Sequence, residues 1–480
     1  MNYFNKSIIY YFIVFFILSF GIYARFSYYN DGLWSDEWIS FLFSNPEISF
    51  YKNYVNHLTF EGAPPIILIS NLFWSKILGH YYQTIELASI VYSFASILLL
   101  VFFFKIDKKK KIFFLFLVSV NPFLIYYAGE ARFYSASVFF GLLSIISFLH
   151  LSKKYNLFCI LLFILTTLIS LSVNLYFLSV FVSYFFLCFV KNKKNLFPIF
   201  FFTFLLFIIF NYYYLLNITS LYHNSGAAGS INYKFFIGYF FNIFFADVVL
   251  GGFFLLFLIF CIYLFRNEIK KDNELFLFIL IIFFSYLIPL LYSIFFSQIT
   301  HPRHLINIVI PIIYLISNFI FKLNIRSYLR FCLTFVIIFY SIFIHFKKDK
   351  PYILLKPNPD YIIKYISESD INFLYIPNYI NNFNLNFSKN LLTTSDQIYS
   401  LYNYFFLYSK DFDKKIYVIN DNNYLKHDSF WTICLNNSSF AAMVTISESR
   451  CVNNKFSDNY ILSKVIKNSE FILSQYSKKN

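Results

Sequence analysis

Two adjacent carboxylates, Asp36 and Glu37, occupy the stretch GLWSDEWISF at residues 32–41, just after a hydrophobic segment long enough to cross a bilayer. Acids at this position can face water, or they can cap a short helix whose dipole favours negative charge at its start. The alternative is that they belong to a site for a charged ligand at the membrane surface. Two further polar motifs bear on this choice.

The second motif, YYAGEARFYS at residues 126–135, carries Glu130, Arg132 and Tyr134. Glu130 and Tyr134 are four residues apart, which predicts that they share one helix face while Arg132 projects elsewhere. Two roles stay open for Arg132. It either pairs with Glu130 or another acid as a clamp within the fold, or its guanidinium binds a phosphate, which it suits by geometry and permanent charge.

The third motif, THPRHLINIVIP at residues 300–311, places His301, Arg303 and His304 just before a late hydrophobic segment. A histidine at a membrane interface is often only a hydrated polar residue, and arginine near a span end often extends its charge toward water. Here, however, acids and bases from three separated loops are expected on the same membrane face. Such a cluster indicates a site for a charged ligand near the membrane.

The composition indicates what kind of fold positions these motifs. The chain has 480 residues, a mean hydropathy of +0.61 and 13% charged residues, whereas soluble domains carry about 25% charged residues. These values exclude an ordinary soluble enzyme and predict an α-helical polytopic membrane protein. The formal charge of +15 resides largely in short loops between hydrophobic segments, which are too short to bind nucleic acid.

Eleven hydrophobic segments have roughly the 17 to 25 residues that a transmembrane helix needs. Alternate connections carry 17 Lys and Arg on one side and 6 on the other, the polar tail excluded. The positive-inside rule therefore places the N-terminus in the cytoplasm and the three motifs outside, in a multi-pass protein of the cell (inner) membrane. The expected spans are residues 7–24, 85–104, 112–127, 134–150, 157–173, 174–190, 197–214, 248–265, 275–296, 305–321 and 329–346.

Two details of this bundle are further expectations. A tight turn is expected at residues 172–174, and the long apolar run 235–265 is expected to hold a juxtamembrane helix before its span. The external loop at residues 25–84 contains APPIILISNLFWSKILG, whose proline pair suits a helix start. We therefore expect helices along the membrane surface there.

The composition turns polar after the membrane domain, which we place at residues 1–346. In the tail, residues 347–480, the runs NFLYIP, KIYVIN and FWTICL have strand length. Helical patterns at DYIIKYISES and NYILSKVIKNSEFILSQY complete the prediction of a small extracytoplasmic α/β domain. An oxidising compartment there permits a disulfide between Cys434 and Cys451, although a free pair is equally compatible with the sequence.

Taken in order, these motifs resemble those of the polytopic glycosyltransferases of the GT-C class, in the family that contains protein O-mannosyltransferases and the bacterial lipid A aminoarabinose transferase. The matching elements are Asp36 and Glu37, the proline pair with WSKILG at residues 74–79, Glu130-x-Arg132-x-Tyr134, and Arg303 with the downstream Pro311. The chain departs from the family pattern at Ala63, His304 and Glu86-Leu87, where the family has His, Tyr and Arg-Leu. These departures bear on substrate identity more than on reaction type.

The resemblance implies a sugar donor linked to a polyprenyl phosphate and a glycan, lipid or protein acceptor. It makes Asp36 the general base for an acceptor hydroxyl, with Glu37 orienting Asp36 or binding sugar hydroxyls. Arg132 and Arg303 would stabilise the phosphate as the anomeric bond breaks, and a single displacement would invert the anomeric centre. The remaining donor-binding candidates are Glu130, Tyr134 and His304.

No cofactor is expected, although the two adjacent acids could hold a divalent cation. Two other classes of protein are alternatives. A lipid-linked sugar transporter or flippase usually shows charges within its spans and an internal repeat, whereas the expected spans here are almost free of charge, Asp247 aside. A glycan polymerase or ligase lacks the early Asp-Glu pair and commonly has a large late external loop.

Overall fold

The computed structural model describes the chain in two compact units, a helical unit of residues 1–30 and 43–353 and a second unit of residues 31–42 and 354–480. The domain boundary expected at residues 346–347 stays a prediction. The described residues are 2–27, 37, 40–41, 43–60, 64–104, 106–216, 240–295, 302–346, 368–371, 373–376, 415–418, 428–435, 459–467 and 471–479.

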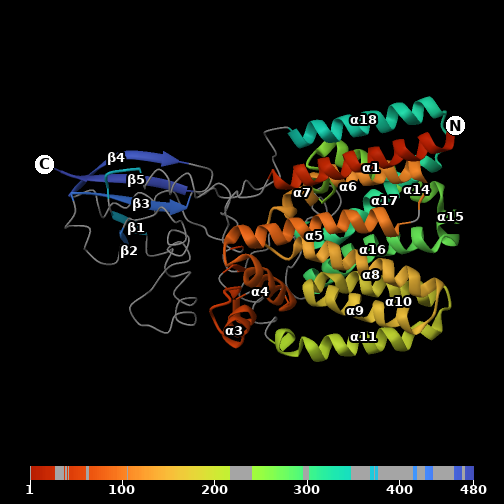
Figure 1. The fold of residues 1–480 in the computed structure, drawn as a ribbon, viewed down its shortest axis with the longest axis horizontal. Helices are drawn as coiled ribbons and strands as arrows, with labels where there is room; N and C mark the ends of the chain where they lie inside the picture. The colour runs from red at the N-terminus through yellow and green to blue at the C-terminus, as the bar shows by residue number, and fades with distance from the viewer. Residues whose placement is uncertain are drawn as a thin grey trace. The chain divides into compact units, whose positions relative to one another are not determined.

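The helical unit is a bundle of long apolar helices joined by short connections (Figure 1). Each of the eleven expected spans coincides with a helix or a pair of helices, and η1 and η4 are short 3-10 helices that precede two of them. Their bounds are α1 Asn2–Phe26, α5 Tyr82–Phe103, α6 Lys108–Val120, α7 Pro122–Ala128, α8 Tyr134–Lys153, α9 Leu157–Val173, η1 Leu175–Phe177, α10 Leu178–Val190, α11 Phe197–Phe210, α14 Val248–Leu264, α16 Asn273–Phe295, η4 Pro302–Ile308, α17 Val309–Lys322 and α18 Ser327–Phe346.

The helix lengths make the chain a multi-pass membrane protein. Among the described residues, 6 helices are long and apolar enough to cross a membrane, or up to 7 if the bent pair of α6 and α7 counts as one span. The other four expected spans correspond to shorter apolar helices of at most 17 residues. The expected number of eleven spans therefore depends on four helices that are near the lower limit for crossing the hydrocarbon core.

The centre of the bundle is α17. In the most apolar 18 residues of the segment Pro302–Lys322, 83% are buried, compared with 28% in the corresponding part of α1 and 17% in that of α18. Of the 14 residues of α17, 11 are buried, including its run of isoleucines, so other helices surround it rather than lipid. The helix α17 is therefore the core of the unit, whereas α1 and α18 present most of their apolar side chains outward.

Hydroxyl side chains connect α8, α9 and α10 inside this apolar environment. The Ser144 hydroxyl lies 2.8 Å from Thr167 Oγ1 and 3.2 Å from the Tyr184 hydroxyl, and Ser147 lies 2.8 Å from Thr166 Oγ1. Small residues let helices approach closely in a membrane, and hydrogen bonds between helices then add to the packing. These contacts fix α8, the helix that carries Tyr134, against its neighbours.

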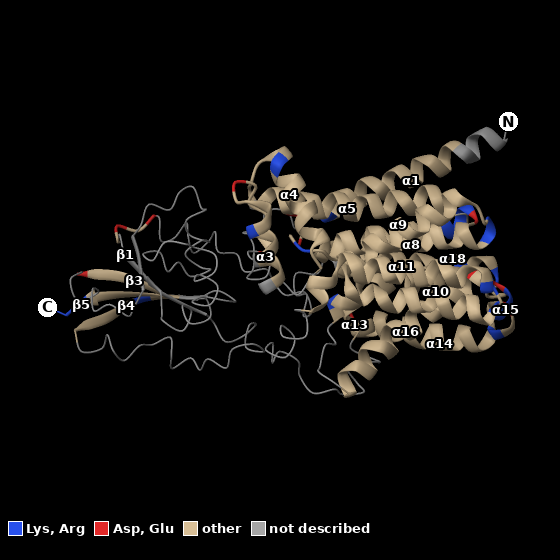
Figure 2. Cartoon of the chain, turned by 90° about the horizontal axis from the view of Figure 1, so that it is seen from below, with Lys and Arg blue, Asp and Glu red and all other residues tan. Residues whose placement is uncertain are grey.

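Basic side chains gather at one end of the bundle, the end marked by α15, Arg266–Lys271 (Figure 2). This end contains the connections after α5, α8, α10, α14 and α17, which supply most of the Lys and Arg of the unit. The asymmetry is the one that the sequence predicts. Its assignment to the cytoplasmic side follows from the positive-inside rule and stays a prediction.

The helix pair α6 and α7 is bent by 53° at Asn121. Asn121 caps α7, because its side-chain oxygen accepts a hydrogen bond from the Leu124 N–H at 3.0 Å, and its Nδ2 donates to the Phe244 carbonyl at 2.9 Å. Pro122 follows at the first position of α7, where its missing N–H costs nothing. The break ends α6 at Val120, and α7 then leads into the connection that carries Glu130 and Arg132.

Arg25 stabilises this break from the end of α1. Its guanidinium is buried, with only 1% of the residue exposed. Its Nε donates to Ser93 Oγ at 2.7 Å, and its Nη1 donates to the carbonyls of Gly21 at 2.9 Å and Ser119 at 3.1 Å. The last carbonyls of a helix have no partner within their own helix, and a cation near them is favoured by the dipole. Arg25 therefore joins α1, α5 and the end of α6.

Replacement of Arg25 by Met is expected to lower the free energy of unfolding by about 2–3 kcal/mol, because hydrogen bonds to a charged group are lost and the Ser119 carbonyl stays buried. The thermal unfolding midpoint of the purified protein in detergent measures this. Lys76→Met, at an exposed cation of the loop before α5, is the control and should leave the midpoint unchanged. An unchanged midpoint in Arg25→Met would show that Arg25 does not support the break.

The apolar run 235–265 divides as the sequence predicts, within its described part. A short helix, α13, Phe240–Phe245, precedes α14, and Ala246 between them has a positive φ of 52°. Asp247, the acid noted in this span, caps α14 by accepting from the Leu250 N–H at 2.8 Å. A Cβ added at Gly251 would lie 2.6 Å from the Phe241 carbonyl oxygen, so glycine allows the two helices to touch.

The external loop contains the helices α3, Phe50–Phe60, and α4, Ile66–Leu78, and the second of these begins directly after the proline pair, as expected. Both views show α3 and α4 at the end of the bundle opposite α15 (Figures 1 and 2). Burial lowers the pKa of His80, in the turn before α5, to about 4. This shift favours the neutral form of the His80 ring.

The second unit contains a five-stranded mixed sheet with strand order β2-β1-β3-β5-β4. The strand β1 pairs in parallel with β2 and β3, whereas β5 pairs antiparallel with β3 and β4. Trp431 is buried at its centre and donates from Nε1 to Ser369 Oγ at 3.0 Å. The bounds are β1 Phe373–Ile376, β2 Lys415–Val418, β3 Ser429–Leu435, β4 Tyr460–Lys467 and β5 Phe471–Lys478.

The three runs of strand length are confirmed as β1, β2 and β3, but the helix expected at residues 459–476 is wrong. This segment forms β4 and β5, joined by a short connection. Its apolar residues at spacings of three and four fit a helix, yet its isoleucines, Val465 and Tyr476 also favour strands. The strand β5 pairs antiparallel with β3 at seven positions. This pairing favours the strand conformation, and the local sequence pattern does not reveal it.

Outcomes for the cysteines differ between the units. Cys159, Cys188 and Cys261 are free and buried in the helices, whereas the free Cys332 is exposed on α18. The disulfide considered between Cys434 and Cys451 depends on side chains outside the described residues. It stays a prediction.

Candidate functional site at the end of the bundle opposite the basic connections

The connection between α7 and α8, residues 129–133, carries two of the candidate residues. It is not helical: α7 ends at Gly129, whose N–H bonds to the Tyr126 carbonyl at 3.1 Å, and α8 begins at Tyr134. The prediction that Glu130 and Tyr134 share one helix face is therefore wrong. The helix is interrupted between them, and both side chains are instead buried at the start of α8.

Hydrogen bonds from neighbouring hydroxyls hold this connection in place. The Ser89 hydroxyl of α5 donates to the Arg132 carbonyl at 3.2 Å, and the Ser135 hydroxyl donates to the Tyr127 carbonyl at 3.0 Å. Backbone anchored from both sides in this way positions the attached side chains with little freedom. The connection is thus a rigid support for Glu130 and Arg132 rather than a mobile loop end.

The side chains of the connection are buried despite their polarity. Glu130 is 2% exposed, Arg132 8% and Tyr134 1%. The Arg132 guanidinium lies over the Phe133 ring, 5.6 Å from its centroid, and the Tyr134 ring contacts Tyr127 edge to face at a centroid distance of 4.7 Å. A guanidinium in such a desolvated, aromatic setting interacts strongly with any anion that reaches it, because the local dielectric constant is low.

The helix η4 carries Arg303 and His304, both half-buried. The His304 ring stacks on Tyr176 of η1, with ring centroids 4.4 Å apart and an interplanar angle of 27°. His301, the third residue of this motif, lies outside the described residues. The stacking shows that η1, a segment to which the sequence assigns no site residue, belongs to the same end of the bundle.

Three polar side chains join these segments. The Asn174 Nδ2, next to η1, donates to Ser137 Oγ at 2.9 Å, and the Asn307 side chain of η4 lies 2.9 Å from the same oxygen through Nδ2 and 3.1 Å through Oδ1. A Cβ at Gly141 would lie 3.2 Å from Asn307 Oδ1, so this glycine allows η4 to approach α8. The network brings the start of α8 and η4 together at one end of the bundle.

Of the acidic pair Asp36 and Glu37, the structure describes only Glu37. Asp36 lies outside the described residues, as does Ala63. Glu37 is described, in helical conformation and buried. Residues 31–42 group with the second unit of the chain, whereas Arg132 and Arg303 belong to the helical unit. The roles assigned to the acidic pair therefore stay predictions.

Sequence reasoning missed several residues of this end of the bundle. Asn174, Ser137 and Asn307 escaped notice because they are single polar residues in apolar segments. Glu86, which the sequence marked only as a departure from a family pattern, is 0% exposed and lies one turn before Ser89 on α5. A carboxylate inside an apolar span is costly unless it is compensated, and the position of Glu86 within the expected span 85–104 is the signal that could have drawn attention to it.

Metal ligation finds no support in the described part of the chain, where no group of three or more His, Cys, Asp or Glu could hold a metal ion. Asp36 lies outside the described residues. A divalent cation held by the acidic pair therefore stays a prediction.

The bundle, the short helices of the first external loop and the added sheet define a GT-C-like polytopic fold, as the sequence motifs led us to expect. Among solved structures, the chain is similar to ArnT from Cupriavidus metallidurans bound to undecaprenyl phosphate, with a TM-score of 0.54 and 8% identity over 96% of this chain and 97% of that chain. The apo state of ArnT from the same organism gives a TM-score of 0.48 at 9% identity over the same shares. No protein-family model and no curated protein sequence matches the chain.

Proposed function

We propose that the chain is a membrane glycosyltransferase that moves a sugar from a polyprenyl-phosphate-linked donor to an acceptor on the extracytoplasmic face. The observation that carries this proposal is the fold, which is shared with a protein crystallised with undecaprenyl phosphate. It is supported by the two arginines, Arg132 and Arg303, at the end of the bundle opposite the basic connections. A polyprenyl phosphate is a lipid, so an enzyme that uses it must meet it within the bilayer.

In the proposed reaction, the acceptor oxygen attacks the anomeric carbon and the bond from that carbon to the phosphate oxygen breaks. The bonding electron pair stays on the phosphate, which leaves as polyprenyl phosphate, a competent leaving group that needs no proton. The guanidinium groups of Arg132 and Arg303 stabilise the charge that develops there. A single displacement of this kind inverts the anomeric centre.

An acceptor hydroxyl loses its proton as it attacks, and we assign Asp36 as the base that takes it. The sequence surrounds Asp36 with Leu33, Trp34 and Trp38, which would partly desolvate the carboxylate and raise its basicity. Glu37 would orient Asp36 or bind sugar hydroxyls. An acceptor that is itself a phosphate would need no base, and Asp36 would then only position it.

The proposal includes an orientation of the bundle in the membrane. The basic end of the bundle would face the cytoplasm under the positive-inside rule, so the start of α8 and η4 would face the extracytoplasmic side. The donor would therefore be used on the extracytoplasmic leaflet.

A donor panel tests the proposal. The purified chain in liposomes is incubated with membrane acceptors and with labelled sugars carried on a polyprenyl phosphate, on a polyprenyl diphosphate or on a nucleotide. We expect labelled acceptor only from the polyprenyl phosphate sugars. Transfer from nucleotide sugars would overturn the donor assignment. Movement of intact donor across the liposome membrane without product would instead identify a transporter.

A further inference from the structure

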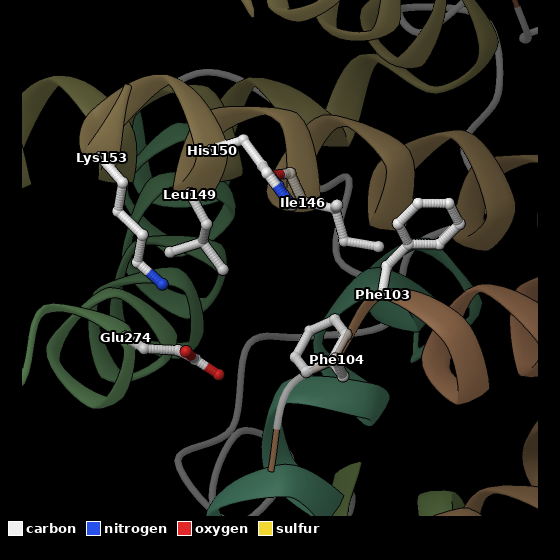
Figure 3. A pocket seen from close by; sticks show the side chains of 7 residues that line it. All are labelled: Phe103, Phe104, Ile146, Leu149, His150, Lys153 and Glu274. Carbon is white, nitrogen blue, oxygen red and sulfur yellow. The ribbon is translucent and has the colours of Figure 1, made fainter. Parts of the chain in front are cut away.

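A cavity of about 170 Å³ opens at the basic end of the bundle, between α5, α8 and α16 (Figure 3). Its floor is apolar, with Phe104 and Ile146 buried, and its rim is polar, with His150 and Lys153 exposed. The lining residues are Phe103, Phe104, Ile146, Leu149, His150, Lys153 and Glu274.

The cavity is separate from the candidate site. Both are bordered by α8, but Tyr134 is the first residue of that helix and Lys153 is its last. At 1.5 Å per residue, the lining residues Ile146 to Lys153 lie about 18 to 29 Å along the axis from Tyr134. A ligand in this cavity therefore does not touch the residues proposed to act on the donor.

Opposite charges face each other across the rim. Figure 3 shows the Lys153 amine directed toward Glu274 and the Glu274 carboxylate extending into the cavity, with the His150 ring on the neighbouring turn of α8. The Glu274 carboxylate accepts a hydrogen bond from the Tyr314 hydroxyl and is attracted to Lys153. The Tyr314 ring packs on Phe278 at a centroid distance of 4.6 Å, which fixes the position of its hydroxyl.

The histidine leaves one ring nitrogen for a ligand. His150 Nδ1 lies 2.8 Å from the Ile146 carbonyl, which can only accept, so Nδ1 carries the proton in that contact. The other nitrogen, Nε2, accepts from a donor when the ring is neutral and donates to an anion when the ring is protonated. Lys153 and His150 are one turn apart on the same helix face and form a polar edge that carries the Lys153 charge.

We propose that this cavity binds the headgroup of a phospholipid that carries both a phosphate and a primary amine. The phosphate would lie against Lys153 and His150, and the ammonium would donate to the Glu274 carboxylate. A purely anionic group suits the cavity less, because Glu274 would repel it. Basic pockets between transmembrane helices are known to hold lipid headgroups on the cytoplasmic side.

Size and depth support a lipid rather than a larger ligand. Pockets for drug-sized ligands have volumes of about 300–1,000 Å³, so a cavity of about 170 Å³ suits only a small polar group. Phe103, Lys153 and Glu274 stand at or next to the ends of their membrane helices, the depth at which headgroups lie. Phe103 is 51% exposed beside the cavity, so an acyl chain can continue from the headgroup over its ring.

The alternative is that Lys153 and Glu274 only hold α8 to α16 around a hydrated recess. The experiment measures the lipid bound to the purified protein by native mass spectrometry after delipidation and exposure to vesicles with ethanolamine, choline or glycerol headgroups. We expect the wild-type protein to retain the ethanolamine lipid. Retention should fall about tenfold in Lys153→Gln and in Glu274→Gln, because each variant loses one hydrogen bond to a charged group. Lys154→Gln, at the exposed neighbouring residue, is the matched control.

Thermal midpoints in lipid-free detergent separate binding from folding. Lys153→Gln and Glu274→Gln should unfold close to the wild-type midpoint there and differ only in the rise that ethanolamine lipid produces. Equal retention of all three lipids, or full retention in both variants, would overturn the proposal. Stronger retention of the glycerol lipid would contradict the assignment of an amine to Glu274. If soluble phosphoethanolamine raised the midpoint as much as the ethanolamine lipid does, the ligand would not need to be a lipid.

Discussion

Replacement of Asp36 by Asn is expected to reduce transfer to a hydroxyl acceptor by about 10²- to 10⁴-fold, the usual contribution of general acid–base catalysis. The amide keeps the shape of the side chain but takes up no proton from the attacking hydroxyl. Donor binding should change little, because the lipid phosphate is assigned to the arginines. The measurement is the rate of transfer at saturating donor, compared between the variant and the wild type.

The control for Asp36→Asn is Glu47→Gln, which neutralises an exposed carboxylate of the same external loop. Its rate should stay near that of the wild type. The pH dependence adds a second test, since the acid side of the wild-type rate profile reports protonation of the base and should disappear in Asp36→Asn. Wild-type transfer by this variant would rule out Asp36 as the base.

Replacement of Arg132 by Gln is expected to reduce transfer by about 10²- to 10³-fold, the loss found when one preorganised donor to a developing anion is removed. Arg132 is buried over the Phe133 ring on a connection anchored by Ser89 and Ser135. Its charge is therefore held in place before the donor binds. Arg132→Lys should retain part of the activity, because lysine keeps the charge but loses the planar fork that matches a phosphate.

The matched control for Arg132→Gln is Arg266→Gln, an exposed arginine at the basic end of the bundle. That variant should transfer at the wild-type rate. Because Arg132 is buried, its variants need a folding check by thermal midpoint and size-exclusion profile. A well-folded Arg132→Gln with wild-type activity would assign Arg132 to a structural clamp, the alternative that the sequence left open.

The membrane spans were predictable because an apolar segment in lipid can satisfy its backbone only as a helix. The role of Asp247 as the cap of α14 was not predicted, because the sequence showed it only as a charge next to a span. The hairpin of β4 and β5 was not predictable in the same way. Its local spacing fits a helix and a strand alike, and pairing with β3, more than 30 residues earlier in the chain, decides between them.

The candidate site was likewise predictable from local sequence only in part, because some of its contacts join residues far apart in the chain. Residue type alone suggested Arg132 and Arg303, since a guanidinium suits a phosphate by geometry and permanent charge, and the role assigned to them stays a prediction. The interruption at Gly129 was not foreseen, so the helix face assigned to Glu130 and Tyr134 was wrong. Ser137 and Asn307 are 170 residues apart, and only the folded chain brings their side chains within 2.9 Å.

The most direct test of the central claim is the binding of undecaprenyl phosphate to the purified chain in detergent, because this product of the proposed reaction is the same whatever the sugar. The account predicts saturable binding that weakens at least about tenfold in Arg132→Gln, the loss of one charge-assisted contact, and stays unchanged in Lys153→Gln at the opposite end of the bundle. Absence of binding, or equal affinity in Arg132→Gln and wild type, would contradict it.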